Sequence, residues 1–305
     1  MRAAAGATFA RVRDVGMNED AFARHRSLLF TVAYEMLGSA ADAEDVVQET
    51  WLRWVEVDHA VVRDQRAYLV RIVTRQALNR LRSMARRRED YVGEWLPEPL
   101  LTGPDVGADV ELAESVSMAM LTVLETLGPA ERAVFVLREV FDIPYEEIAE
   151  AVGKSSAAVR QIAHRAREHV AARRPRTPVS TTEQQEVVDQ FLSAIRHGDL
   201  QGLLDVLAPD IVVVADGGGF VTAFRRPIEG AERVAGLLLA GLRSADLEAT
   251  ATWLNGEPAI RFDLGGQVDT AVSLAVEEGR ITRIYAVRNP HKLTRLDGVA
   301  ALTRT

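Results

Sequence analysis

The stretch RAYLVRIVTRQALNRLR, residues 66–82, decides how the first part of the chain folds. Its apolar residues recur every three or four positions, which predicts a helix over residues 65–86. At about 100° per residue, four arginines fall within a sector of about 60° with an asparagine at its edge: Arg71, Arg75, Arg82, Arg86 and Asn79. No acidic residue lies in this helix. A solvated face would normally interleave Glu, so the pattern predicts a polyanion as partner.

The sequence before this helix predicts two more helices. Asn18 can cap a first helix that ends at Gly38, and Ser39 can cap a second. The second contains DAEDVVQETWLR, residues 42–53, and one buried stripe is predicted for Val47, Trp51, Trp54 and Val55. A different face, which is either solvated or a contact surface, carries Asp45, Gln48 and Glu49.

A helix-turn-helix is predicted near the middle of the chain. One helix opens at Pro129, a second runs over residues 145–152, and a third follows the tight turn at Gly153 and runs to about residue 170. The start of the third helix suits phosphate contacts by Lys154, Ser155 and Ser156. Candidates for base edges in the major groove are Arg160, Gln161, His164 and Arg165. For His164 a solvent-facing position is an equal alternative.

Charge is segregated along the chain, although the net charge is −8. Residues 60–88 hold nine Arg and one acid, residues 89–131 ten acids and no base, and residues 154–176 seven bases and one acid. The absence of cysteine excludes disulfides, thiolate zinc sites and cysteine nucleophiles, and it suits a reducing cytoplasm. No apolar run reaches the length of a membrane helix, and no metal-ligand cluster or nucleotide-binding loop appears, so neither membrane contact nor a cofactor is expected.

Residues 42–53 and 66–82 resemble conserved region 2 of the sigma-70-family initiation factors, in their extracytoplasmic-function class. Residues 155–168 resemble region 4 of the same family. The resemblance implies a factor that directs core RNA polymerase to promoters, with Asp45, Gln48 and Glu49 on the β′ clamp helices and region 4 at the β flap. It also implies that the Arg-rich helix, from Arg66 onward, and the loop over residues 57–65 capture the −10 strand, while region 4 reads the −35 element.

The acidic segment over residues 89–126 is predicted to be a linker, solvated for most of its length. Trp95 and Leu96 are the exception, because large apolar side chains do not stay in water. Prolines at 97 and 99 stiffen an extended stretch around them. In sigma factors the corresponding linker threads the polymerase cleft, and an acidic strand there would mimic nucleic acid.

A separate α+β domain is predicted after residue 178. Helices are expected over residues 182–197, shortly after residue 199 and around 229–242, and strands over 211–215, 247–254, 258–263, 267–277 and 280–287. Helices followed by an antiparallel sheet are typical of this class. The pattern resembles the SnoaL-like fold of the nuclear-transport-factor-2 superfamily. Its position after a sigma core resembles the ECF41 group.

Three short strings carry that second resemblance: WLPEPL at 95–100, DGGG at 216–219 and NPHKL at 289–293. The resemblance implies a built-in regulator that contacts the sigma modules and the linker through Trp95, Leu96, Pro97, Asp216, Gly217, Gly218, Gly219, Asn289 and Pro290. Phe220 stands where the group usually has Lys, and His291 where it usually has Asp. These departures put any charge-dependent contact of the glycine turn in question.

The expected organisation is therefore multi-domain, with two all-α domains and a carboxy-terminal α+β domain. Its boundaries are a disordered leader over 1–17, with Met17 as an alternative start, then 18–88, the linker 89–126, 127–175, 180–296 and a tail over 297–305. Two alternatives stay open. A small-ligand or enzymatic domain could use Asp216, Asp263, Asp269 or His197 beside the walls Trp253 and Tyr285. A conventional regulator would bind duplex DNA without polymerase.

Overall fold

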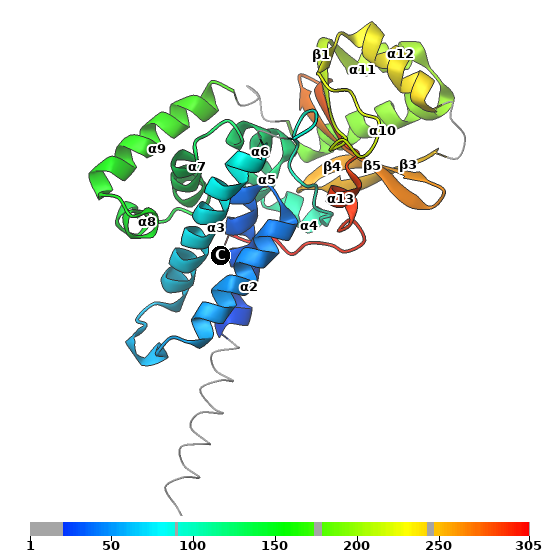
Figure 1. The fold of residues 1–305 in the computed structure, drawn as a ribbon. Coiled ribbons are helices and arrows are strands. Elements are labelled where there is room, and N and C mark those ends of the chain that lie inside the picture. The colour runs from blue at the N-terminus through cyan, green and yellow to red at the C-terminus, as the bar shows by residue number, and fades with distance from the viewer. Residues whose placement is uncertain (1–20, 89–90, 174–178, 243–246, 305) are drawn as a thin grey trace, which may run out of the picture. The chain divides into compact units, whose positions relative to one another are not determined.

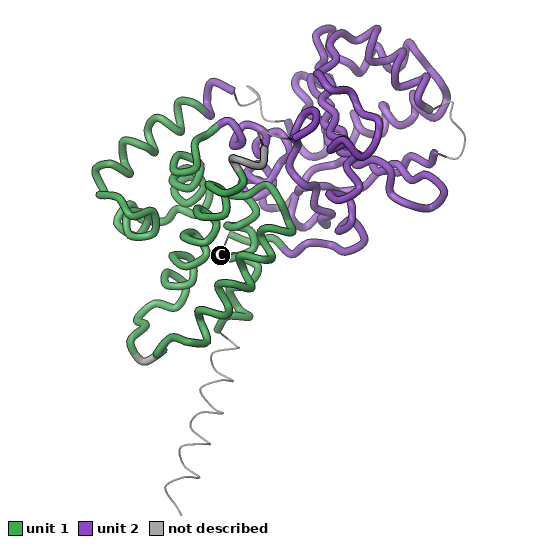
Figure 2. The backbone as a smooth tube through the Cα atoms, in the orientation of Figure 1, with its two compact units in different colours: residues 1–84, 127–169, 302–305 green, residues 85–126, 170–301 purple. Residues whose placement is uncertain are grey.

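The computed structural model describes residues 21–88, 91–173, 179–242 and 247–304. The expected leader, the Asn18 cap and Met17 lie outside these residues. The chain forms two compact units (Figure 2). Unit 1 comprises residues 1–84, 127–169 and 302–305, and unit 2 comprises residues 85–126 and 170–301.

The first half of unit 1 is a helical bundle (Figure 1). Residues 21–37 are helical, and Gly38 ends this helix with a φ of 67°. Ser39 caps α2 (Ala40–Val55) through a bond from the Asp42 amide, η1 (His59–Val61) follows, and α3 spans Gln65–Arg88. Trp54 is fully buried in the bundle, as predicted. Val55 is 47% exposed, so its predicted burial is wrong, because it is the last helical residue and lies beyond the packed stripe.

The second half of unit 1 contains the helix-turn-helix. Helix α7 (Pro129–Phe135) continues into the π-helical turn η2 (Val136–Val140), and α8 spans Tyr145–Val152. Gly153 takes the left-handed conformation at the end of α8, with a φ of 69°, and α9 follows over Ser156–Ala171. The inner face of α9 is buried at Val159, Ile162, Ala163 and Ala166. The predicted turn and both flanking helices are confirmed.

The linker is not the solvated tether that its acidity suggested. It forms α4 (Pro104–Ala108), α5 (Val110–Val116) and α6 (Met118–Leu124), and these lie in unit 2. Its apolar side chains are buried at Leu96, Leu100, Met118 and Leu121. Asp105, Asp109 and Glu111 are exposed, whereas Glu98 is buried with the apolar residues. Net charge alone does not reveal this amphipathic pattern.

The rest of unit 2 is an α+β domain around a six-stranded sheet of order β2-β1-β6-β5-β4-β3. The strands are β1 (Leu207–Asp216), β2 (Ile228–Glu229), β3 (Leu247–Leu254), β4 (Glu257–Leu264), β5 (Gln267–Glu277) and β6 (Arg280–Val287). Its helices are α10 (Thr181–His197), α11 (Leu200–Val206), α12 (Ala231–Leu242) and α13 (Pro290–Leu293).

The sheet is mixed rather than purely antiparallel. Strands β3 to β6 pair antiparallel in sequence order, but β1 pairs parallel with β6. Tight turns at Gly265-Gly266 and Glu278-Gly279 join β4 to β5 and β5 to β6. The pairing of β1 joins segments about seventy residues apart, with Val213 opposite Ile284, and no local turn residue can predict it.

The two faces of the sheet bury different partners. One face packs against α10, α11 and α12, with Phe191, Leu203 and Ile284 in its core. The other face packs against the linker and α13, through Leu96, Met118, Tyr285 and Leu293 among others. The linker is therefore an additional layer of this domain.

Candidate functional site

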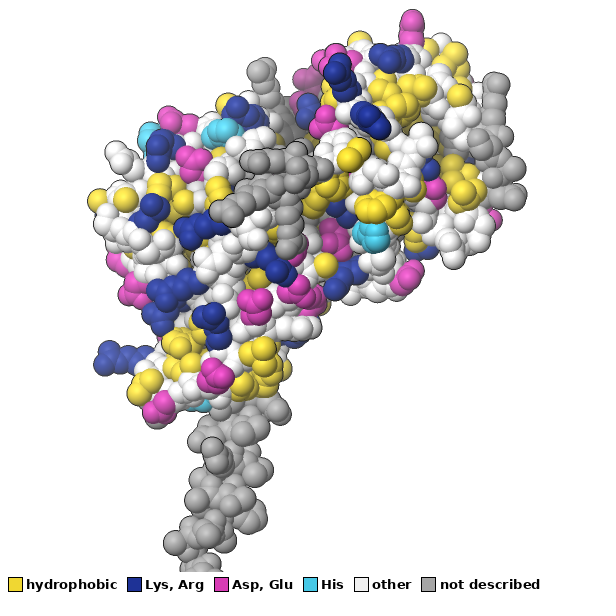
Figure 3. Space-filling view, viewed as in Figure 1, with side chains coloured by type: hydrophobic (Ala, Val, Ile, Leu, Met, Phe, Trp, Pro, Cys, Tyr) yellow, Lys and Arg dark blue, Asp and Glu magenta, His cyan; other side chains and the backbone are white. Residues whose placement is uncertain are grey.

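The arginine face of α3 lies mostly at the surface of unit 1. Arg75, Asn79 and Arg82 are exposed, and Arg82 donates to the Asn79 side-chain oxygen at 3.4 Å. Arg71 and Arg66 are half-buried. Arg86 lies on the helix, but its side chain is outside the described part of the structure. In Figure 3 several Lys and Arg side chains gather where α3 and α8 lie.

Two arginines of this face, and Arg66 at the start of the helix, already have partners within unit 1. Arg71 Nη1 is 3.0 Å from Glu150 Oε2, and Arg75 Nη2 donates to the main-chain oxygen of Glu150 at 2.8 Å. Arg66 Nη2 is 3.5 Å from the main-chain oxygen of Arg304 in the tail. The predicted DNA-binding face is thus partly occupied by the protein itself.

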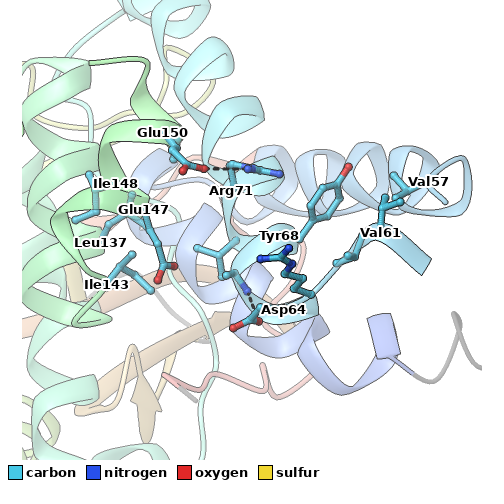
Figure 4. Close-up of a pocket in the computed structure, with 15 residues that line it drawn as sticks. Val57, Val61, Asp64, Tyr68, Arg71, Leu137, Ile143, Glu147, Ile148 and Glu150 are labelled. Carbon is cyan, nitrogen blue, oxygen red and sulfur yellow. Dashed lines mark hydrogen bonds and ion pairs between the residues drawn. The ribbon is translucent and has the colours of Figure 1, made fainter. Parts of the chain in front are cut away.

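A pocket of about 450 Å³ lies beside this face (Figure 4). One wall comes from the loop over 57–65 and the start of α3, including Val61 and Tyr68. The opposite wall comes from the helix-turn-helix, including Ile143, Glu147 and Ile148. Figure 4 shows Glu150 pointing towards Arg71 across this pocket.

The predicted contact face of α2 is exposed. Asp45, Gln48 and Glu49 all reach the surface, and Leu52, with 61% exposure, lies near them on the same helix. Arg80 of α3 pairs with Asp45 and, at 2.8 Å, with Asp42. Because Asp45 still keeps more than half of its side-chain surface, the pairing leaves it accessible.

The predicted residues of the helix-turn-helix also share one accessible surface. Those exposed are Lys154, Ser155, Arg160, Gln161, His164 and Arg165, and Ser156 is half-buried. Ser155 accepts a bond from the Ala158 amide at 3.3 Å. Arg160 pairs with Glu146 of α8 at 2.9 Å. His164 lies 3.6 Å from Glu168, so both alternatives for its role are retained.

The three predicted regulatory strings meet at the carboxylate of Asp216, at the end of β1. Asp216 is fully buried. Its Oδ2 accepts from the Leu96 amide at 3.0 Å and from Lys292 Nζ at 2.7 Å. Its Oδ1 accepts from the Tyr91 hydroxyl at 2.6 Å and from the Gly218 amide at 3.0 Å. The carboxylate therefore binds the linker as well as its own glycine turn.

Lys292 completes the contact from the opposite side. Its Nζ also donates to the main-chain oxygen of Leu96 at 2.5 Å and lies 3.2 Å from the ring centroid of Trp95. Asn289 Nδ2 donates to the Tyr91 hydroxyl at 2.9 Å. We call this group the linker clamp: Tyr91, Trp95 and Leu96 of the linker with Asp216, Asn289 and Lys292 of the domain.

Tyr91 and Lys292 are the members of the clamp that sequence reasoning missed. Lys292 lay inside the quoted string NPHKL, whereas nothing in the sequence around Tyr91 indicated a partner. Burial, followed by the hydrogen bond to Asp216, raises the pKa of the Tyr91 phenol well above its usual value. Tyr91 therefore stays a proton donor over the physiological pH range.

The glycine turn is shaped by close neighbours. A Cβ added to Gly218 would lie 2.3 Å from Asn289 Nδ2, and one added to Gly217 would lie 2.7 Å from the Val221 main-chain oxygen. Pro97 is buried, and Pro290 is the first residue of α13. The clamp is charge-dependent despite the departures at Phe220 and His291, because its ionic pair is Asp216 with Lys292. Phe220 and His291 pack on each other, with centroids 4.5 Å apart.

A second contact holds the linker at the turn between β3 and β4. The side chain of Asn255, fully buried, accepts from the Leu100 amide at 3.0 Å and donates to the Val116 oxygen at 2.9 Å. The Gly256 amide donates to Thr102 Oγ1 at 2.9 Å. A Cβ on Gly256 would lie 2.9 Å from Ala113 Cα, so the linker helices pack tightly on this turn. Asn255 carried no sequence signal beyond a turn.

The residues considered for catalysis do not gather in one place. Asp263 pairs with Arg261, Asp269 pairs with Arg288 at 3.0 Å, and His197 lies near the Ser193 oxygen on α10. Tyr285 lines a cavity of about 600 Å³ between α6 and the sheet, together with Thr122, Asp210, Glu277 and Arg283. Trp253 instead faces Gly107 of the linker.

Two further searches concern only the described residues. They contain no helix long and apolar enough to cross a membrane. They also contain no cluster of three or more His, Asp or Glu side chains placed to hold a metal ion.

Comparison with known proteins connects these surfaces to one family. The model of sigma-70 region 2 matches residues 21–88, and that of sigma-70 region 4 matches residues 117–170 and so begins within the expected linker. The ECF RNA polymerase sigma factor SigJ of Mycobacterium tuberculosis is 37% identical over 297 residues, covering 91% of this chain and 94% of the relative. The probable ECF RNA polymerase sigma factor SigI of the same species is 32% identical over 276 residues, covering 90% and 93%.

The likeness extends to the three-dimensional structure. The crystal structure of M. tuberculosis SigJ matches with a TM-score of 0.73 at 32% identity, covering 91% of this chain and 98% of that one. The match therefore includes the helical regions and the domain with the mixed sheet.

Proposed function

This chain belongs to the ECF RNA polymerase sigma factors of the sigma-70 family and acts as a sigma factor, and from that premise we propose how its surfaces divide the work of initiation. The exposed face of α2 binds core polymerase at the β′ clamp helices, and region 4 binds at the β flap. The arginine face of α3 and the loop over 57–65 hold the −10 strand. The exposed face of α9 reads the −35 element.

The separation of exposed from buried residues supports these assignments. On α9 the apolar side is buried and the polar and cationic side, including Arg160 and Arg165, is exposed. Exposed cations on a recognition helix suit phosphate and base-edge contacts. On α3, Arg75 and Arg82 reach solvent while the opposite side packs in the bundle.

We further propose that the carboxy-terminal domain regulates the factor in cis by holding the linker. The observation that carries this proposal is the buried pair of Asp216 and Lys292, which binds both the amide and the carbonyl of Leu96. Removing one partner of a buried ion pair costs about 3–5 kcal/mol, because the other charge is left buried without a partner, so a substitution at either residue should disrupt the clamp. A linker held in this way is not free to enter the polymerase cleft.

Run-off transcription with reconstituted holoenzyme tests the clamp. Trp95→Ala removes the ring over Lys292 from the linker side, and Lys292→Met removes the cation from the domain side. Asp263→Asn is the matched control, because this carboxylate lies on the same sheet but pairs with Arg261. We expect both clamp variants to give severalfold more transcript than the control. Equal amounts of transcript from the two clamp variants and the control would show that the linker clamp does not regulate transcription.

A further inference from the structure

The cavity between α6 and the sheet takes no part in the surfaces assigned above. Its volume of about 600 Å³ lies within the roughly 300–1,000 Å³ of small-molecule sites. The roof comes from α6 and the turn after it, through Ala119, Thr122, Val123 and Thr126. The floor is the face of the sheet that packs against the linker, opposite the face covered by α10, α11 and α12. A molecule bound here would contact the linker and the domain at once.

Arg283 of β6 lies at the centre of the floor. It is paired with Val212 of β1 on one side and with Ala275 of β5 on the other, and both of these apolar residues line the cavity. Its guanidinium donates a hydrogen bond to the Tyr285 hydroxyl. Tyr285 is 4% exposed, and burial raises its pKa to about 12 against the opposing effect of Arg283, so the hydroxyl keeps its proton. Arg283 and Tyr285 therefore offer a cation and an O–H donor to one anionic group.

The acidic residues of the cavity lie at one end of the floor. Asp210 is two residues before Val212 on β1, and Glu277 is two residues after Ala275 on β5. Because β1 is parallel to β6 and β5 is antiparallel to it, both carboxylates lie on the side of Arg283 towards the start of β6. Two strand residues span about 7 Å. Tyr285 lies on the other side of Arg283, so the cavity has an acidic end and a cationic, hydroxyl-bearing end.

The charges of the lining cancel one another. Arg173 is the second cation that lines the cavity, so two cations accompany two carboxylates. Within the described part of the chain, Asp210, Glu277 and Arg283 form no ion pair. A ligand with a single charge would be attracted at one end and repelled at the other. A ligand that carries both charges about 7 Å apart satisfies both ends, and two residues of extended peptide span about that distance.

We propose that this cavity binds a small zwitterion of the dipeptide class, with its carboxylate at Arg283 and Tyr285 and its ammonium at Asp210 and Glu277. The small apolar side chains of such a ligand lie against Val212 and Ala275. Because α6 forms the roof, the ligand ties the linker to the sheet and adds to the linker clamp. That consequence for transcription rests on the proposed regulation through the linker, whereas binding itself does not.

Isothermal titration calorimetry of the full chain with L-alanyl-L-alanine, without polymerase, tests the binding. N-acetyl-L-alanyl-L-alanine lacks the ammonium, and L-alanyl-L-alanine amide lacks the carboxylate. A hydrogen bond to a charged group is worth about 1.5–3 kcal/mol, so we expect each blocked peptide to bind about tenfold more weakly or worse. No measurable binding of the free dipeptide, or equal binding of the three peptides, overturns the proposal.

Substitution of Arg283 assigns the binding to this cavity. Arg283→Gln should bind the free dipeptide about tenfold more weakly than the natural chain and should no longer distinguish it from the amide. The matched control is Arg233→Gln, because Arg233 is an exposed arginine of α12, on the other face of the sheet. We expect the control to discriminate between the two peptides as the natural chain does. If Arg283→Gln discriminates equally well, the dipeptide binds elsewhere and the proposal is wrong.

Hydrogen exchange tests the contact with the linker. L-alanyl-L-alanine should slow exchange of the α6 amides, because a ligand that binds only the docked linker stabilises it. Unchanged exchange of these amides in the saturated protein contradicts the place of α6 in the site. The transcription test of the linker clamp is independent, since clamp variants that leave transcription unaltered refute the regulatory role and not the binding of the dipeptide.

Discussion

At the scale of single residues, function depends on which polar side chains are buried and which are exposed. Asp216 has no exposed surface, and its carboxylate binds four donors, two of them from the linker. The resemblance to the ECF41 group implied that Asp216 is a regulatory contact, but no residue near it in the sequence indicated which linker group it binds. The deciding partner, Tyr91, lies 125 residues away in the sequence.

The base-reading role of α9 is tested by charge reversal. Arg165→Glu or Arg160→Glu should reduce promoter use in run-off transcription by tenfold or more on some −35 sequences and less on others, because a bidentate base contact is worth about 1–3 kcal/mol. The comparison needs a set of promoters that differ only in the −35 element. If promoter use falls equally on all promoters of the set, both residues contact phosphates rather than base edges.

The hydroxyl of Tyr91 should contribute measurably to the clamp. Tyr91→Phe leaves the ring against Trp95 but removes the bond to Asp216, and a hydrogen bond to a charged group is worth about 1.5–3 kcal/mol. We expect a lower urea midpoint for the transition followed by Trp fluorescence. An unchanged midpoint would mean that the hydroxyl is satisfied equally well by water.

At the scale of elements, helices and strands followed the sequence closely. The predicted α3, α8 and β5 match the structure to within a few residues, because hydrophobic periodicity and turn residues act locally. The parallel pairing of β1 with β6 and the short helices of the linker escaped prediction. Both depend on partners distant in the sequence, as do Tyr91 and Asn255 in the two linker contacts.

The turn between β3 and β4 should be needed to hold the linker. Asn255→Ala removes two buried hydrogen bonds and also places Ala at a φ of 55°, so we expect a loss of about 3 kcal/mol or more. Asn255→Gly removes the same bonds without the backbone strain. Hydrogen exchange of the Leu100 amide provides the measurement. If the Leu100 amide is as well protected in both variants as in the natural chain, the contacts of Asn255 do not hold the linker.

The same region predicts a dependence of stability on pH. Burial, together with the charge of Glu114, raises the pKa of Glu257 to about 7 against a partial offset by Gln184. A folded pKa above the unfolded value stabilises the protonated form, so this contribution is complete below about pH 4.5 and is lost as pH rises through about 7. Glu257→Gln should make the urea midpoint depend less on pH between about 4.5 and 7. If the substitution leaves that pH dependence unchanged, the raised pKa of Glu257 is not its cause.

At the scale of the whole molecule, the linker belongs structurally to the carboxy-terminal domain. It shares unit 2 with that domain, while the helices that precede and follow it form unit 1. Region 2 and region 4 are therefore joined by a segment that packs with the domain that we propose to be the regulator. A domain tethered in this way would act on the linker at high effective concentration.

Removal of the domain should uncover the linker. A chain truncated after Pro178 would leave Leu96 and Met118 without the sheet residues that they pack against. We expect this truncated chain to bind a hydrophobic dye strongly and to aggregate, because exposed apolar patches of this kind promote association. A soluble, monomeric truncated chain that binds no dye would show that the linker has another way to bury these side chains.

The most direct test of the account is in vitro transcription from a promoter library by core polymerase with and without the full chain. We predict that the chain co-elutes with core polymerase and directs initiation at promoters that share two elements, at −10 and −35. A chain that neither co-elutes nor alters initiation would contradict it.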